Sequence, residues 1–405
     1  MNNTKIIGPF TQIVPLSGLS LKGSIADEDL TLFDNHWITV TNGKVESFDA
    51  KPNLSSADEV VEIAEKHVLV PGLVDCHTHM IWGGNRAQDY SMRMAGKSYQ
   101  EILANGGGIF DSVRKTQEAA SGELMSSFLK RANRHIADGV TTAEVKSGYG
   151  LEPEHELKIL ETLSQAQSHT PIDIIATCLA AHVCPKDKER QEFLDLIIRD
   201  LLPTLKSQSL AKRVDIFVED NAFPVDIALP YLQEARRMGF DITVHADQFT
   251  TGGSELAVQV GALSADHLEA SGEKEIKLLA ASDTVAVALP GASLGLGMQF
   301  TPARKLLDAG ASLAISTDWN PGSAPMGDLL VQASLLGIYE KLSSAELLAG
   351  ITFRAAQALG LSDRGILEPG KLADMIAFPL QDFREIFYNQ GKVKPDMVWK
   401  KGVLV

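Results

Sequence analysis

Eight short apolar runs, each of six or seven residues, are the feature that most constrains how this chain can fold. They occupy residues 72–77, 140–145, 173–179, 214–219, 241–246, 262–267, 284–289 and 312–317. Most are near-continuously apolar rather than alternating, which is typical of strands covered on both faces, as in parallel sheets. Helical patterns separate them, such as Leu157, Leu160 and Leu163 before the third run. Eight strands alternating with helices over about 250 residues predict an α/β fold, a (β/α)8 TIM barrel, with a doubly wound open sheet as the alternative.

The two ends of the chain have a different pattern, with short alternating runs typical of a partly exposed sheet. Near the N-terminus such runs flank Asn42 and Gly43, a strong hairpin-turn signal. The C-terminal end has the same pattern of short alternating runs. We therefore expect residues 1–66 and 366–405 to form a small composite β-sandwich domain, and residues 67–365 to form the barrel. Two unrelated terminal extensions would fit the same pattern.

Composition excludes several classes of protein. With 44% hydrophobic and 22% charged residues, the chain is globular rather than disordered or coiled-coil. Its net charge of −15 argues against nucleic acid or an anionic membrane as partner, because these bind clustered Lys and Arg. The longest uncharged stretch, residues 284–303, is broken by Pro290 and several glycines, so we expect no membrane span. The three cysteines and the lack of a secretory signal predict a cytoplasmic protein.

Five of the ten histidines stand at or just after the ends of predicted strands: His77, His79, His182, His245 and His267. In a barrel these ends form the catalytic face. His77 and His79 are two residues apart, so in an extended segment both imidazoles point to one side and can reach one cation. His245 would add a third imidazole and Asp318 a carboxylate, a set that suits Zn²⁺ or Fe²⁺. Taken singly, each also has a structural interpretation, such as a turn former for Asp318.

Longer segments carry a resemblance to a known family. VPGLVDCHTH (70–79) and EPGKLADMIAF (368–378) resemble the amidohydrolase superfamily, and the likeness runs from about residue 60 to the C-terminus. Five more segments narrow the resemblance to the imidazolonepropionase family: GGNRAQDY (83–90), EVKSGYGL (144–151), AAHVCP (180–185), VHADQ (244–248) and STDWNPGS (316–323). The resemblance implies hydrolysis of the cyclic amide of 4-imidazolone-5-propanoate, a small-molecule substrate, to N-formimino-L-glutamate in histidine degradation.

The resemblance also assigns roles to residues at matching positions. The metal ligands would be His77, His79, His245 and Asp318, holding one divalent ion per chain, Zn²⁺ or Fe²⁺. The substrate contacts would be Arg86, Tyr99, Tyr149, His182, Gln248, His267, Asn320, Gly322 and Ser323. Arg86 would take the propionate in a bidentate geometry. Many members carry Glu where this chain has Gln248, so we place no general base there. A homodimer is implied as well.

The implied catalytic residues are Asp318, His267 and His182. The metal would lower the pKa of its bound water, Asp318 would pass a proton to the leaving nitrogen, and the two histidines would stabilise the oxyanion. Two other functions remain open. A nucleobase deaminase uses similar ligands but needs no anion clamp such as Arg86 with Tyr149. A non-catalytic metal-binding barrel scaffold would lack a complete ligand set.

Overall fold

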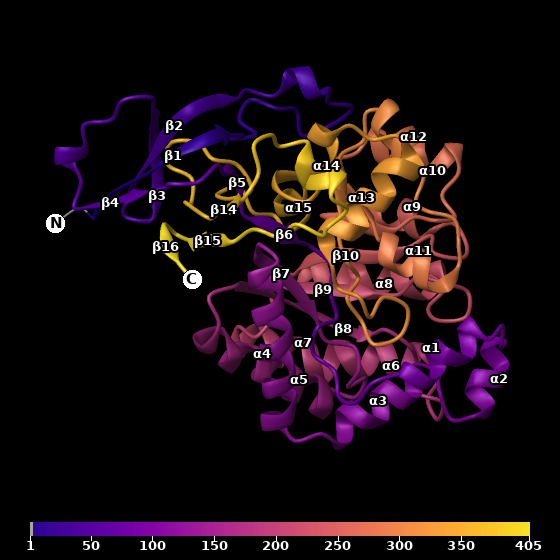
Figure 1. Ribbon diagram of the computed structural model, residues 1–405. Coiled ribbons are helices and arrows are strands. Elements are labelled where there is room, and N and C mark those ends of the chain that lie inside the picture. The colour runs from indigo at the N-terminus through magenta and orange to yellow at the C-terminus, as the bar shows by residue number, and fades with distance from the viewer. Residues whose placement is uncertain (1–2) are drawn as a thin grey trace.

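The computed structural model describes residues 3–405, apart from the side chain of Tyr99, and contains a barrel with a separate sheet beside it (Figure 1). The barrel strands are β6 (Leu73–Asp75), β7 (Val140–Lys146), β8 (Asp173–Ala181), β9 (Arg213–Ile216), β10 (Asp241–Ala246), β11 (Ser264–His267), β12 (Val285–Ala288) and β13 (Leu313–Ile315). They are parallel and pair in sequence order. Each overlaps one of the eight predicted runs, and the predicted barrel is confirmed.

The edge strands β6 and β13 close the ring through the residues that follow them. The amide of Asp318 donates to the carbonyl of His77 at 3.0 Å, and the amide of His79 donates to the carbonyl of Trp319 at 3.0 Å. Thr78 and Trp319 form a parallel bridge between these hydrogen bonds. The closure therefore lies at the carboxyl ends of the strands, and it sets the H-x-H segment directly beside Asp318.

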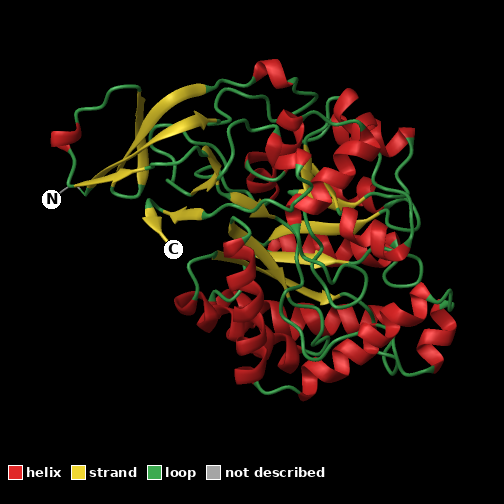
Figure 2. Cartoon of the chain, in the orientation of Figure 1, coloured by secondary structure: helices red, strands yellow, loops and turns green. Residues whose placement is uncertain are grey.

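Helices surround the barrel strands (Figure 2). They are α1 (Ala87–Met94), α2 (Tyr99–Ala104), α3 (Ile109–Glu118), α4 (Ser121–Ala137), α5 (Pro153–Ala166), α6 (Arg190–Leu196), α7 (Leu202–Gln208), α8 (Val225–Arg237), α9 (Gly253–Gln259), α10 (Glu273–Ala280), α11 (Pro290–Leu296), α12 (Ala303–Asp308), α13 (Leu329–Glu340), α14 (Ser344–Gly350), α15 (Phe353–Ala358) and α16 (Glu385–Tyr388). Short 3₁₀ turns span Asp27–Asp29, Leu54–Ser56 and Gln167–His169, and a π segment, Ile197–Leu201, joins α6 to α7.

Helix α5 illustrates why these connectors are helical. It begins at Pro153, where the fixed φ of proline suits a first turn that needs no amide donor. Ile159, Leu160 and Leu163 lie on one side of the helix and are buried in the barrel's outer core. The helix therefore forms because its apolar stripe covers the strands beneath it.

The second sheet is built from both ends of the chain. Its strands are β1 (Thr4–Ile13), β2 (Phe33–Thr41), β3 (Lys44–Asp49), β4 (Glu59–Glu62), β5 (Val68–Pro71), β14 (Met375–Phe378), β15 (Met397–Lys400) and β16 (Val403–Leu404). Strand β5 pairs with β1 on one side and with β14 on the other, so the two termini share one sheet rather than forming unrelated extensions. The prediction of a small β domain from both termini is confirmed. Its proposed limits at residues 66 and 366 stay a prediction.

The terminal sheet encloses a hydrophobic core of its own. Asn42 and Gly43 form the β2–β3 turn, both with positive φ as a tight hairpin requires. The turn then meets the segment ahead of β14, because the amide of Ala373 donates to the carbonyl of Gly43 at 2.9 Å. Side chains such as Phe10 and Trp399 fill the enclosed space, with their rings edge to face. The sheet thus has a hydrophobic core separate from that of the barrel.

A partly buried ion cluster joins the sheet to the barrel. The Nζ of Lys400 on β15 lies 2.8 Å from Oδ2 of Asp173 on β8, and Nη1 of Arg364 lies 2.5 Å from the same oxygen. Lys400 also pairs with Asp374. The cluster fixes the terminal sheet at the end of the barrel opposite the histidines.

Within the described residues 3–405, no helix is both long and apolar enough to cross a bilayer. The uncharged stretch 284–303 instead forms β12 and α11. The stretch is apolar in sequence because β12 is a strand of the barrel wall and is buried on both faces.

Candidate active site

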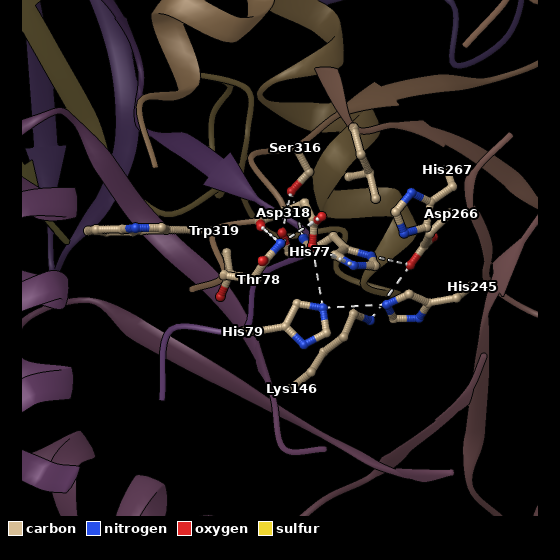
Figure 3. Close-up of polar contacts among 12 residues, drawn as sticks. His77, Thr78, His79, Lys146, His245, Asp266, His267, Ser316, Asp318 and Trp319 are labelled. Carbon is tan, nitrogen blue, oxygen red and sulfur yellow. Dashed lines mark hydrogen bonds and ion pairs between the residues drawn. The ribbon is translucent and has the colours of Figure 1, made fainter. Parts of the chain in front are cut away.

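Four of the predicted site residues converge at the carboxyl end of the barrel (Figure 3). One ring nitrogen of each of His77, His79 and His245 lies within 4.8 Å of the others, and the two Nε2 atoms of His79 and His245 are 3.4 Å apart. Oδ1 of Asp318 lies 3.5 Å from Nε2 of His77 and 3.4 Å from Nε2 of His79. All four side chains are buried, and Nε2 of His77 has no hydrogen-bond partner among the described residues.

This donor set fits a divalent metal ion. Facing imidazole nitrogens with an adjacent carboxylate oxygen are the ligands that Zn²⁺ and Fe²⁺ prefer. Burial lowers the pKa of His79 to about 3, so its imidazole is neutral at pH 7, as a ligand must be. Although burial opposes its charge, the adjacent imidazoles of His77 and His79 hold the pKa of Asp318 well below its ordinary value. The carboxylate is therefore anionic.

Two buried carboxylates orient two of these rings. Nδ1 of His77 lies 2.7 Å from Oδ2 of Asp266, and Nδ1 of His245 lies 2.8 Å from Oδ2 of Asp215. A carboxylate at Nδ1 fixes the proton there and leaves Nε2 free to face an ion. Asp266 comes from β11 and Asp215 from β9, the strands on either side of β10, so the barrel wall fixes the orientation of both rings.

A lysine links these carboxylates inside the barrel. Nζ of Lys146 lies 2.8 Å from Oδ2 of Asp215, 2.7 Å from Oε2 of Glu144 and 3.6 Å from Oδ2 of Asp266, with no exposed surface. Although burial opposes its charge, Asp215 and Glu144 hold the pKa of Lys146 above its ordinary value. Nε of Arg213 adds a second cation 3.4 Å from Oε1 of Glu144. The barrel interior below the histidines therefore contains a buried network of ion pairs.

Sequence reasoning missed this network, although a signal for it exists. Glu144 and Lys146 lie two residues apart on β7, and Arg213 and Asp215 lie two apart on β9. In a strand such pairs share one face. Two opposite charges on the inner face of a strand expected to be buried indicate an internal ion pair.

A cavity of about 370 Å³ opens beside the histidines. It is lined by His79, Arg86, Arg93, Lys97, Ile102, Ile109, Tyr149, His182, Phe217, His245, Gln248, Phe249, His267, Leu296, Asp318, Asn320 and Ser323. The expected substrate contacts are therefore gathered on one cavity. Gly322 adjoins it, because a Cβ there would lie 2.4 Å from Nη1 of Arg86. Tyr99 begins α2, and its side chain lies outside the described part of the structure.

Two expected substrate contacts are held by buried carboxyl groups. Nε of Arg86 donates to Oδ2 of Asp89 at 2.8 Å, which leaves the outer guanidinium nitrogens for a ligand. Tyr149 lies in a loop whose amides, those of Gly150 and Leu151 included, donate to Glu156 at 2.7 Å. Burial raises the pKa of Tyr149, so its hydroxyl stays protonated and can donate.

His182 follows β8 and lies beside the expected ligands. Its ring stacks on His79 with centroids 5.3 Å apart. Its Nδ1 is 3.1 Å from the carbonyl of Gly148, so this nitrogen carries the proton. Burial lowers the pKa of His182 to about 4, so the ring is neutral at pH 7 and its Nε2 is an acceptor. This geometry favours contact with a substrate N–H over donation to an oxyanion.

His267 ends β11 on a strained backbone. Its φ is 85° and that of Leu268 is 69°, values that non-glycine residues rarely adopt and that cluster at functional sites. Nδ1 of His267 lies 3.6 Å from Oε2 of the buried Glu269. The unusual turn directs the ring toward the expected ligands, with its centroid 5.3 Å from that of His245.

The loop after β13 is organised by Asn320. Its Nδ2 donates to Oδ2 of Asp318 at 2.9 Å, and its Oδ1 accepts from the amides of Gly322 and Ser323, both at 2.8 Å. One side chain therefore holds the carboxylate and shapes the adjoining loop. Gln248 also reaches the cavity but offers only an amide, as expected.

Comparisons with known proteins agree with this geometry. Residues 68–405 match the amidohydrolase family, to which the chain therefore belongs. A zinc-bound adenosine deaminase from Xanthomonas campestris has the same fold, with a TM-score of 0.73 at 17% identity over 99% of this chain and 92% of its own. Within the family, curated relatives that match this chain include imidazolonepropionases. That of Deinococcus deserti is 39% identical over 100% of both chains, and that of Bdellovibrio bacteriovorus is 37% identical over 96% of this chain and 94% of its own. The resemblance to the imidazolonepropionase family is confirmed.

Proposed function

We propose that this chain hydrolyses the ring amide of 4-imidazolone-5-propanoate to N-formimino-L-glutamate, using one Zn²⁺ or Fe²⁺ ion per chain. The convergence of His77, His79, His245 and Asp318 on a cavity that also holds Arg86 carries this proposal. The full-length similarity to imidazolonepropionases supports the choice of substrate. A nucleobase has no carboxylate for Arg86 to bind, which disfavours a deaminase.

The four residues His77, His79, His245 and Asp318 would hold the ion. When bound there, a divalent ion lowers the pKa of a coordinated water toward neutrality and polarises a carbonyl oxygen. Asp318 is anionic at neutral pH and fixed by Asn320, so it can accept a proton from the attacking water. The same carboxyl group then gives this proton to the ring nitrogen as the C–N bond breaks.

The remaining residues bind and orient the substrate. Arg86 pairs with the propionate, and the Tyr149 hydroxyl donates to the same group or to the ring. His182 accepts a hydrogen bond from a ring N–H through its free Nε2, as its contact with Gly148 dictates. His267 would then donate the hydrogen bond to the oxyanion. A well-aimed donor of this kind lowers the activation free energy by about 3 kcal/mol.

The proposal is tested by following the ultraviolet absorbance of 4-imidazolone-5-propanoate with the purified chain. We expect loss of the imidazolone signal, abolition by prior chelation, and recovery on addition of Zn²⁺ or Fe²⁺. Adenosine and cytosine serve as control substrates and should not react. Unchanged imidazolone absorbance, or turnover of adenosine or cytosine that is faster than that of the imidazolone, would overturn the assignment.

We further propose that the enzyme acts in the cytoplasm as a homodimer. All three cysteines are free, which fits a reducing compartment. Light scattering coupled to gel filtration tests the dimer, and a monomeric mass at micromolar concentration would contradict it.

A further inference from the structure

Two guanidinium groups on helix α1 face the same cavity. Arg86 precedes the first residue of α1 and Arg93 lies in its last turn. Seven residues are about two helical turns, so the two side chains project from the same side. Both line the cavity beside the histidines.

Both guanidinium groups lie close to Gly322. A Cβ on Gly322 would lie 2.4 Å from Nη1 of Arg86, and the carbonyl oxygen of Gly322 lies 3.5 Å from Nη1 of Arg93. The same Nη1 donates to the carbonyl of Gly295 at 2.9 Å. Arg93 thus ties the loop after β13 to α11 at the rim of the cavity.

Arg93 differs from the other cations of the cavity in having no ion-pair partner among the described residues. Arg86 pairs with Asp89 at 2.8 Å, and Lys97 pairs with Glu101 at 2.9 Å. Within the described part of the chain, Arg93 forms no ion pair, and its hydrogen bonds go to carbonyl oxygens. Burial lowers the pKa of Arg93, and repulsion from Arg86 lowers it further. The positive charge of Arg93 therefore has no ion-pair partner of its own, and the nearby carboxylate of Asp89, which attracts it, is already paired with Arg86.

We propose that Arg93 is a second anion-binding residue, which selects carboxylate-bearing substrates together with Arg86. The inference rests on the proposed function and extends it, because no role has so far been assigned to Arg93. In a chain with net charge −15, a local positive rim is needed to draw an anion into the cavity. Arg93 provides this attraction and, through Gly322, holds the loop after β13 in place.

The kinetic test compares Arg93→Gln, Arg93→Lys and a matched control. Arg236→Gln is the control, because its Nη1 also donates to two backbone carbonyls, those of Val260 and Gly261, away from the cavity. We expect Arg93→Gln to raise KM about tenfold with kcat within about twofold, and to weaken the fall of kcat/KM with salt. Arg93→Lys keeps the charge and should recover most of the salt dependence. Wild-type KM and salt dependence in Arg93→Gln would overturn the inference.

A binding test separates this inference from the proposed function. Calorimetric titration with glutarate, a five-carbon dicarboxylate, needs no turnover. We expect weaker glutarate binding in Arg93→Gln than in the wild type and in Arg236→Gln, at equal zinc content. Equal affinity in all three proteins would overturn the role of Arg93 even if the wild type hydrolyses the imidazolone. Weaker binding in Arg93→Gln alone would support it even if hydrolysis is absent. If Arg93→Gln does not fold, Arg93→Lys is titrated with glutarate instead: an affinity below that of the wild type supports the inference, because an ammonium group does not reproduce the planar guanidinium fork, and a wild-type affinity overturns it.

Discussion

Nζ of Lys146 lies 2.8 Å from Oδ2 of Asp215, the same oxygen that lies 2.8 Å from Nδ1 of His245. A single carboxylate oxygen therefore connects a buried cation to a ring expected to bind the metal. Asp266 makes the equivalent connection to His77. The orientation of these two expected ligands thus depends on the charge balance inside the barrel.

Replacing Lys146 by Met should damage both stability and metal binding. The change leaves Glu144, Asp215 and Asp266 buried without the cation that they share, and breaking a buried pair costs about 3–5 kcal/mol. Urea unfolding should show this loss of unfolding free energy, and elemental analysis should show less than one metal ion per chain. Lys305→Met on α12 is the control. Wild-type values of both quantities in Lys146→Met would contradict the network.

Asp215→Asn should weaken metal binding with less effect on the fold. The amide no longer attracts the proton on Nδ1 of His245, and loss of such an orienting carboxylate costs about 10–100-fold in metal affinity. Competition with a chelator measures this affinity. Asp226→Asn, on the exposed start of α8, should leave it unchanged. Equal affinities in the two variants would show that Asp215 does not orient a ligand.

Arg86→Gln should impair substrate binding and leave the metal in place. A hydrogen bond to a charged group is worth about 1.5–3 kcal/mol, so we expect KM to rise about 10–100-fold. Asp89→Asn should give a smaller rise, because it removes only the partner that holds Nε of Arg86. Steady-state kinetics with metal analysis tests both variants. A fall in kcat at unchanged KM would contradict the anion-binding role.

Asp173→Asn should loosen the junction between barrel and terminal sheet in a pH-dependent manner. Although burial opposes its charge, Lys400 and Arg364 hold the pKa of Asp173 below its ordinary value. A carboxyl group with a lowered folded-state pKa stabilises the fold above the unfolded pKa of about 3.9 and loses that contribution as the pH falls through the folded value.

We therefore expect Asp173→Asn to lower the unfolding free energy by about 2 kcal/mol at pH 7. The difference from wild type should shrink as the pH falls below about 4. Denaturant titrations across this range measure it, with the exposed Asp195→Asn as control. A difference that is constant with pH would rule out the ion pairs as its source.

The barrel could be predicted because its strands are nearly continuous apolar runs, and the terminal hairpin because Asn42 and Gly43 favour one turn. The ends of the strands were less predictable. Beyond Asp75, the segment expected to continue β6 instead bonds to residues 316–319, a partner that is distant in sequence. This closure forms only when the whole barrel is assembled, so no local sequence pattern predicts it.

The convergence of His77, His79, His245 and Asp318 could be predicted because His and Asp at strand ends, supported by the family resemblance, point to one face of the barrel. Lys146 and its partners could not, because their pairing depends on register between strands. Lys146 is opposite Thr177 on β8, and Thr177 is opposite Arg213 on β9. Arg93 escaped notice for a similar reason, since its partners Gly295 and Gly322 lie far along the chain.

Hydrolysis of 4-imidazolone-5-propanoate in water enriched in ¹⁸O tests the central claim most directly. The zinc- or iron-loaded chain is mixed with substrate, and the product is identified by mass spectrometry. We expect N-formimino-L-glutamate with one solvent oxygen in its new carboxylate, and no product from the His245→Ala variant. Unreacted imidazolone, or product formed equally well by that variant, would contradict a metal-dependent hydrolysis at this site.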